Sequence, residues 1–246
     1  MTHAWTLFRL AMLELWTSYR LLAALAVMLA SGGLALVAAE VADPASMPGG
    51  VPGRPPVGAW FGLALALAVA VVAALVAGAL AGERRRGFSG WLVSRSAPRA
   101  TLVVAWFGAG ALVILAGGAI SAIVAWLAVI SRGTASPDAA ASFAAAAASC
   151  LAAAMAAVAL GVLAGVTLVP ALATLAAGTA TAAWLIGMAL AVPVAAYVPG
   201  GGFVTMATSH LAAQPVAVSL GSAGVSLALA AAMLVLAQVA FARIDL

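Results

Sequence analysis

The stretch VGAWFGLALALAVAVVAALVAGALA, residues 57–81, decides the fold class because it contains no charged side chain. A helix that crosses a bilayer core of about 30 Å needs about 20 consecutive apolar residues, and this stretch exceeds that length. The whole chain has the same character, with 67% hydrophobic and 7% charged residues, whereas soluble domains have about 25% charged residues. We therefore expect an all-α, polytopic membrane protein. This composition excludes a soluble enzyme, a disordered tail and a nucleic-acid-binding domain.

Six stretches are long and apolar enough to cross a membrane, and they predict a single six-span transmembrane domain over residues 1–246. The weakest boundary is the uncharged link at 166–170. A kink there in place of a turn would reduce the number of spans to five. The expected spans are residues 21–39, 57–81, 101–130, 139–165, 171–192 and 216–242.

The arginines orient these spans, since cytoplasmic loops of membrane proteins carry an excess of positive charge. The chain has ten arginines and no lysine. With six spans and a cytoplasmic amino terminus, eight arginines lie on the cytoplasmic side and only Arg54 and Arg132 lie outside. We therefore expect a multi-pass protein of the plasma or inner cell membrane with both termini in the cytoplasm.

The sequence offers little for catalysis or metal binding. A nucleotide-binding P-loop needs a lysine to reach the phosphates, so the chain cannot hydrolyse ATP by that route. Its single cysteine, Cys150, excludes an intrachain disulfide, and its two histidines, His3 and His210, lie far apart. Residues 87–90, Gly-Phe-Ser-Gly, match a motif of intramembrane serine proteases, but His210, the one candidate base, is expected on the opposite side of the membrane. We expect no catalytic residue, metal ligand or cofactor in this chain.

Two segments outside the spans have recognisable patterns. Residues 193–215 are apolar but broken by prolines and by three glycines at 200–202, which predicts an outer re-entrant hairpin packed against protein before the last span. Residues 3–20 carry aromatic and apolar side chains at three- and four-residue spacing, which predicts a helix lying flat at the cytoplasmic interface. A simple cytoplasmic extension of the first span is the alternative. The stripe consists of Trp5, Phe8, Met12, Leu15, Trp16 and Tyr19.

None of the six acidic residues is expected in the middle of a span. A secondary transporter usually places ionisable residues inside its spans for ion coupling. The distribution of acids therefore favours an external source of energy. Glycine pairs four residues apart, such as Gly161 and Gly165, predict close packing of helices.

The loop ERRRGFSGWLVSRSAPR, residues 83–99, is the most informative part of the chain. Positive charge on cytoplasmic loops explains its arginines but not its other features. We expect Glu83 to open the loop and Gly87 to permit a turn, followed by a short amphipathic helix that serves as a docking surface. The apolar face of that helix would consist of Phe88, Trp91 and Leu92.

This loop resembles the coupling segment of ABC-2 type membrane subunits of ATP-binding-cassette transporters. In that family the segment has a glutamate, a few polar residues, Gly-Thr, a leucine and then a turn rich in serine, proline and arginine. Here Phe88 stands where the threonine is usual. The carboxyl end FARIDL, residues 241–246, is also similar to the common terminus of the family. The matching loop residues are Glu83, Gly87, Leu92, Ser94, Arg95, Ser96 and Arg99.

The resemblance implies an interfacial helix before the first of six spans and a coupling helix between the second and third. It also implies a separate subunit that binds ATP and Mg, and a second permease subunit, identical or different. Together they would export a hydrophobic or amphipathic substrate. A non-transporting membrane scaffold or assembly subunit and an ion-coupled secondary transporter are the alternatives. The residues expected to contact the ATPase are Glu83, Arg84, Arg85, Arg86, Gly87, Phe88, Trp91, Leu92 and Arg95.

Overall fold

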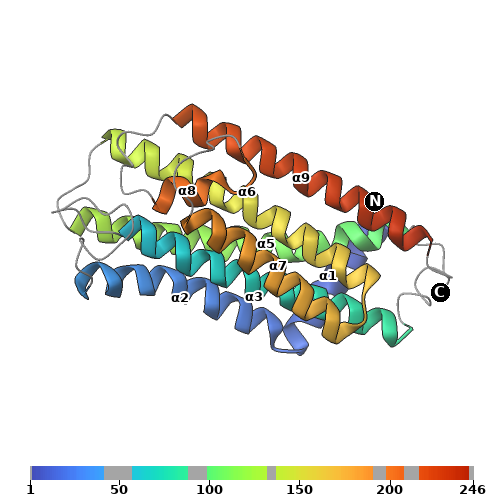
Figure 1. Ribbon diagram of the computed structural model, residues 1–246. Helices are drawn as coiled ribbons and strands as arrows, with labels where there is room; N and C mark the ends of the chain where they lie inside the picture. The colour runs from blue at the N-terminus through green and yellow to red at the C-terminus, as the bar shows by residue number, and fades with distance from the viewer. Residues whose placement is uncertain are drawn as a thin grey trace.

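The computed structural model describes residues 2–41, 57–87, 99–131, 137–190, 198–207 and 216–243. These residues form helices without any strand, and the long helices lie side by side in one bundle (Figure 1). The helices are α1 (Thr2–Thr17), α2 (Arg20–Val41), α3 (Val57–Arg85), α5 (Arg99–Ser131), α6 (Pro137–Thr167), α7 (Pro170–Leu190), α8 (Gly201–Ala207) and α9 (Val216–Ala242).

Five of the described helices, α3, α5, α6, α7 and α9, are long and apolar enough to cross a membrane. Helix α2 meets the same criterion only when it is taken together with α1, from which it is bent by 77°. The chain is therefore a helical, multi-pass membrane protein. The described residues of each of the six stretches expected to span the membrane lie in a separate helix of this bundle.

The link between α6 and α7 is a turn and not a kink. Helix α6 ends at Thr167, α7 begins at Pro170, and the two helices run in opposite directions (Figure 1). Proline suits this position because the first residue of a helix has no partner for its N–H group. The described parts of α1 and α9 consequently reach the same end of the bundle (Figure 1).

The expectation that Glu83 opens a loop is wrong, since α3 continues to Arg85. Arg84 and Arg85 lie in its last turn, where positive charge is favourable near the negative end of the helix dipole. The turn begins at Gly87, whose φ of 75° suits a residue without a Cβ. Its N–H donates to the Arg84 carbonyl at 3.1 Å, which ends the helix.

Helix α6 lies at the centre of the bundle and packs against α3, α5, α7, α8 and α9. Its glycines permit close approach, because a Cβ at Gly161 would lie 2.6 Å from the Ala73 carbonyl oxygen of α3. A Cβ at Gly165 would lie 2.9 Å from the Ala77 carbonyl oxygen. The predicted role of this glycine pair in helix packing is confirmed, and it applies to a contact within the chain.

Helix α1 packs against α5, α2 and α3. Its sharp angle to α2 is made at Tyr19, which adopts a φ of 58°, a value that is uncommon for residues other than glycine. The expected aromatic stripe is divided between two surfaces. Leu15 is buried together with Leu7 and Ala11, whereas Trp5, Trp16 and Tyr19 are exposed.

Candidate functional site at the arginine-rich end

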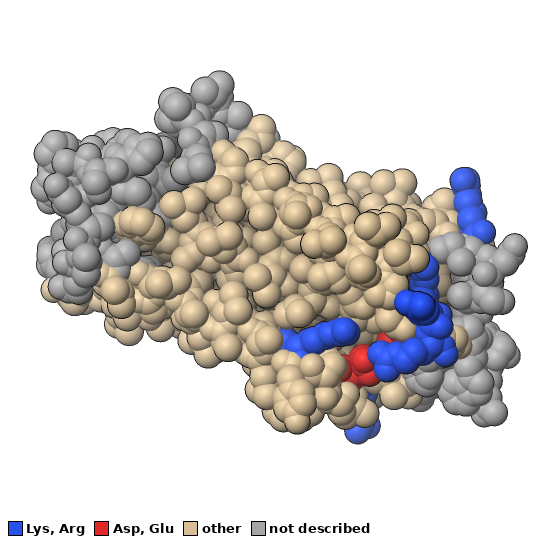
Figure 2. Space-filling model, turned by 60° about the horizontal axis from the view of Figure 1, so that its bottom comes forward, with Lys and Arg blue, Asp and Glu red and all other residues tan. Residues whose placement is uncertain are grey.

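The charged side chains on the face shown in Figure 2 gather toward one end of the molecule, where acidic side chains lie among the arginines. They come from α1, the first residue of α2, the last turn of α3 and the residues that follow α3 and α9. Two glutamates, Glu14 and Glu83, accompany six arginines, which leaves four positive charges in excess among the described side chains of these segments. The six arginines are Arg9, Arg20, Arg84, Arg85, Arg86 and Arg243.

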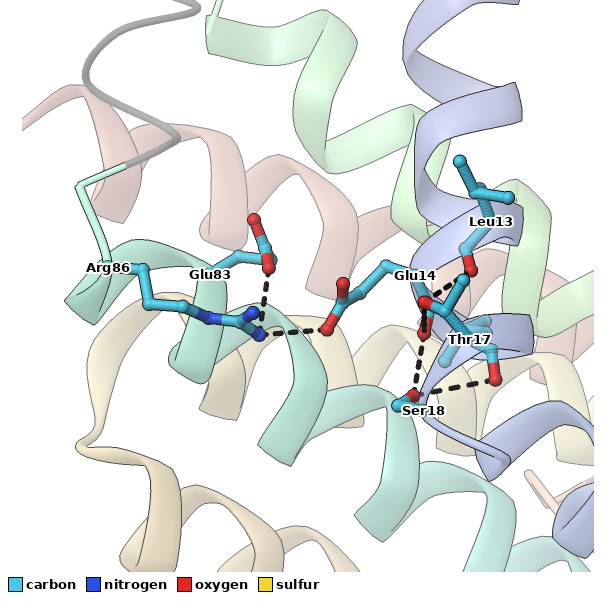
Figure 3. A network of polar contacts seen from close by, with 7 residues as sticks. Leu13, Glu14, Thr17, Ser18, Glu83 and Arg86 are labelled. Carbon is cyan, nitrogen blue, oxygen red and sulfur yellow. Dashed lines mark hydrogen bonds and ion pairs between the residues drawn. The ribbon is translucent and has the colours of Figure 1, made fainter.

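Arg86 joins two helices at this end (Figure 3). Its Nη2 donates to Oε1 of Glu14 in α1 at 2.8 Å and lies 2.9 Å from Oε1 of Glu83 in α3. The two carboxylates therefore share one guanidinium group, whose positive charge offsets the repulsion between them. This contact connects α1 directly to the start of the arginine-rich loop.

The glutamate side of this contact is held by the end of α1. The Ser18 hydroxyl donates to the Glu14 carbonyl oxygen at 2.6 Å, and the Thr17 hydroxyl donates to the Leu13 carbonyl oxygen at 2.9 Å (Figure 3). The Glu14 carbonyl oxygen also accepts from the Ser18 N–H at 3.1 Å, so these hydroxyls add hydrogen bonds to carbonyl groups just before the bend. They fix the backbone from which Glu14 reaches Arg86.

Exposure differs among the three charged groups. The side chain of Arg86 is 59% exposed, whereas those of Glu83 and Glu14 are 11% and 22% exposed. The hydrogen bond to Glu14, followed by the nearby charge of Glu83, raises the pKa of Arg86 above its ordinary value. Exposed ion pairs contribute about 0.2–1 kcal/mol; here the arginine is exposed, whereas the two carboxylates are largely covered.

The structure places the residues predicted to contact an ATPase in different surroundings. It brings Glu83 and Arg86 together, leaves Arg85 and Gly87 exposed, and partly buries Arg84. Phe88, Trp91, Leu92 and Arg95 lie outside the described residues.

Glu14 was not among the residues predicted for this site. A signal was available, because Glu14 is the only acidic residue before Glu40 and lies on a helix with arginine as its other charged residue. Its partner Arg86 is 72 residues away in the chain, however, and no local pattern connects the two.

A second polar region surrounds α8 at the other end of the bundle (Figure 1). Trp184 Nε1 in α7 donates to the Pro199 carbonyl oxygen at 3.2 Å. From α9, the Ser222 hydroxyl donates to the Val198 carbonyl oxygen at 2.9 Å. The hydroxyl oxygen of Ser226 accepts from the Gly200 N–H at 3.2 Å. These neutral hydrogen bonds fix the backbone of residues 198–200 between two long helices.

The arginine-rich end has the chemistry of a contact surface. In the described part of the chain, no group of three or more His, Cys, Asp and Glu side chains could hold a metal ion. What the geometry provides is excess positive charge, an exposed guanidinium group shared by two helices, and a loop that begins beside it. Comparisons of the chain with known protein families, curated proteins and solved structures find no match.

Proposed function

We propose that this chain is the membrane-spanning subunit of an ABC-2 type transporter, driven by ATP hydrolysis in a separate subunit. The observation that carries the proposal is the contact of Arg86 with both Glu14 and Glu83. A force applied to the loop after α3 reaches α1 through this contact without passing through the rest of the bundle. The resemblance of residues 83–99 to the family's coupling segment supports the same loop as the docking site of the ATPase.

The membrane topology that we propose has six spans, with α2 as the first and the arginine-rich end in the cytoplasm. Helix α2 has 22 residues, and at about 1.5 Å per residue it is long enough to cross the bilayer core. Its 77° angle to α1 suits a helix that lies in the interface before the first span. The excess of arginine at one end supports the cytoplasmic orientation of that end.

The placement of the described acids supports an external source of energy. Glu14 and Glu83 lie at the arginine-rich end, and Asp138 lies in the first turn of α6. A transporter that uses an ion gradient usually carries such groups deep within its spans. In our proposal the ATPase supplies the energy instead, and two permease subunits rock against each other to export a hydrophobic or amphipathic substrate from the plasma membrane.

In this mechanism the short helix α8 belongs to an outer re-entrant segment. Phe203 and Met206 of α8 are fully buried, and the helix packs against α3, α6, α7 and α9. Such packing satisfies the requirement that irregular backbone at membrane depth be covered by protein. The segment then does not face the lipid, and its backbone is hydrogen-bonded to α7 and α9.

Purification of the tagged chain from its own membranes tests this proposal. We expect a soluble subunit with a P-loop to co-purify, and the complex to hydrolyse ATP. Deletion of residues 88–92 should abolish co-purification and leave membrane insertion intact, because it removes the docking surface. Reproducible absence of such an ATPase would contradict the proposal and favour a scaffold. Flux in liposomes driven by a proton or sodium gradient without ATP would favour a secondary transporter.

A further inference from the structure

The bend between α1 and α2 is held in a strained backbone conformation. The chain turns by 77° at Tyr19, whose φ of 58° lies in the left-handed region. Among the described residues other than glycine, only Tyr19 has a positive φ. A Cβ makes that region unfavourable, whereas glycine enters it freely. Such a conformation persists only where surrounding contacts impose it, so contacts of α1 elsewhere hold Tyr19 in this state.

Tyr19 forms a joint because its two backbone hydrogen bonds belong to different helices. Its N–H donates to the Trp16 carbonyl oxygen of α1 at 3.0 Å. Its own carbonyl oxygen accepts from the Ala23 N–H of α2 at 3.0 Å. Rotation about φ and ψ of Tyr19 keeps both bonds, because the N–H moves with α1 and the carbonyl group moves with α2. Helix α1 can therefore change its direction as one rigid piece.

Helix α1 has apolar side chains on both sides. Leu7 and Leu15 are buried against the bundle, whereas Leu13 and Trp16 are each 55% exposed. A helix of this kind stays at the membrane when it leaves its neighbours, because acyl chains then cover its inner face. Helices in lipid have no hydrophobic driving force to associate. The position of α1 then depends on side-chain packing, on polar contacts and on the strain at Tyr19.

The polar contact that opposes the strain is the pairing of Arg86 with Glu14. It joins α1 to the residue that follows α3, at 2.8 Å (Figure 3). Glu14 lies five residues before Tyr19, so a turn of α1 about the joint moves its carboxylate away from Arg86. The Arg86 side chain is 59% exposed, and salt in the surrounding water screens its charge. The ion pair and the backbone of Tyr19 therefore act on α1 in opposite directions.

We propose that α1 is a strained latch, which the Arg86–Glu14 pair holds closed against α5 and which the backbone of Tyr19 opens. When Arg86 releases Glu14, Tyr19 returns to a negative φ and α1 turns away from α5 within the membrane interface. Any partner that takes over Arg86 thereby changes the position of α1. This inference rests on the proposed position of α1 at the membrane interface. It does not depend on an ATPase, because the chain itself contains every part of the latch.

Spin labels on α1 and α5 test this inference with the full chain alone in lipid bilayers. Leu13→Cys and Val104→Cys place the labels at positions that are 55% and 51% exposed, and the native Cys150 is fully buried. We expect a main distance for docked α1 and a second, longer distance whose share grows with ionic strength. A single distance that does not change with ionic strength would overturn the latch. Co-purification of an ATPase tests the proposed function separately.

A matched pair of substitutions at the joint isolates the strain. Tyr19→Gly and Tyr19→Ala both remove the aromatic ring, but only glycine removes the conflict between a Cβ and the left-handed backbone. We expect the ratio of released to docked α1 to be about fivefold lower in Tyr19→Gly than in Tyr19→Ala. Equal ratios in the two variants would contradict a strained joint.

A second pair of substitutions isolates the ion pair. Arg86→Gln should raise the share of the longer distance and weaken its dependence on salt. Arg243→Gln removes the same charge from an exposed position after α9 and should keep that dependence. Equal dependence on salt in the two variants would overturn the role of the pair. The salt series on the double-cysteine chain retains Tyr19 and Arg86, so it decides the question even if a variant does not fold.

Discussion

At the arginine-rich end, three charged side chains join α1 to α3, whereas at the other end neutral hydrogen bonds hold the turn before α8 to α7 and α9. The charged contact centres on Arg86, whose side chain is 59% exposed. The neutral contact includes Ser222 and Ser226, which are fully buried. Water and headgroups can replace the partners of an exposed ion, but nothing apolar can replace those of a buried amide or hydroxyl. The first contact is suited to changing partners, and the second to staying fixed.

The largest expected loss of stability follows from crowding the fixed end. A Cβ at Gly202 would lie 2.6 Å from Cβ of Ser149 and 2.7 Å from the Cys150 backbone nitrogen. We expect Gly202→Ala to lower the free energy of unfolding by about 1–3 kcal/mol, as measured by unfolding in mixed micelles. The control Gly224→Ala meets no atom within 4 Å and should be neutral or stabilising. Equal stability of the two variants would show that α8 is not tightly held.

Removal of the serine hydroxyls gives the next largest effect. Ser222→Ala and Ser226→Ala each take one partner from the backbone of residues 198–200 and should cost about 1 kcal/mol each. Hydrogen exchange at residues 198–207 should accelerate in both variants. The control Thr179→Ala removes an exposed hydroxyl that donates only within its own helix, and it should leave exchange unchanged. Faster exchange in the control alone would contradict the comparison.

The smallest effect on stability is expected at the charged end. Arg86→Gln breaks both ion pairs but should lower the free energy of unfolding by less than about 1 kcal/mol, because the arginine is largely exposed. Transport coupled to ATP hydrolysis should nevertheless fall markedly, since α1 loses its connection to the loop. Arg243→Gln removes the same charge from an exposed position after α9, outside the predicted contact residues, and should retain coupling. A large loss of stability in Arg86→Gln, together with normal coupling, would contradict this account. The charged contact would then stabilise the fold and would not transmit movement.

Much of the fold could be predicted from hydropathy because apolar runs end where charges or prolines begin. Residues 216–242 were predicted as a span and form α9, flanked by Pro215 and Arg243. The prediction failed at Glu83, because hydropathy falls there while the backbone remains helical to Arg85. Helix formation depends on hydrogen bonding and terminal charge as well as on apolar character.

The two polar regions differ in how far the sequence could predict them. Serines 219, 222 and 226 follow a three- and four-residue spacing on α9, and all three are buried. This pattern is a local signal for the inward face of a membrane helix. The contact of Glu14 with Arg86 instead depends on the bend at Tyr19, which turns α1 across the bundle. No periodic pattern encodes that bend.

Site-directed cross-linking tests the central claim, that an ATPase subunit docks at the arginine-rich end. The single cysteine of the chain, Cys150, is fully buried, so an introduced surface cysteine is the accessible thiol. Arg85→Cys and Asp138→Cys would carry a maleimide photo-cross-linker at exposed positions in α3 and α6. In native membranes we predict an adduct with a P-loop ATPase from position 85 and none from position 138. An ATPase adduct from position 138 alone, or none from either position, would contradict the account.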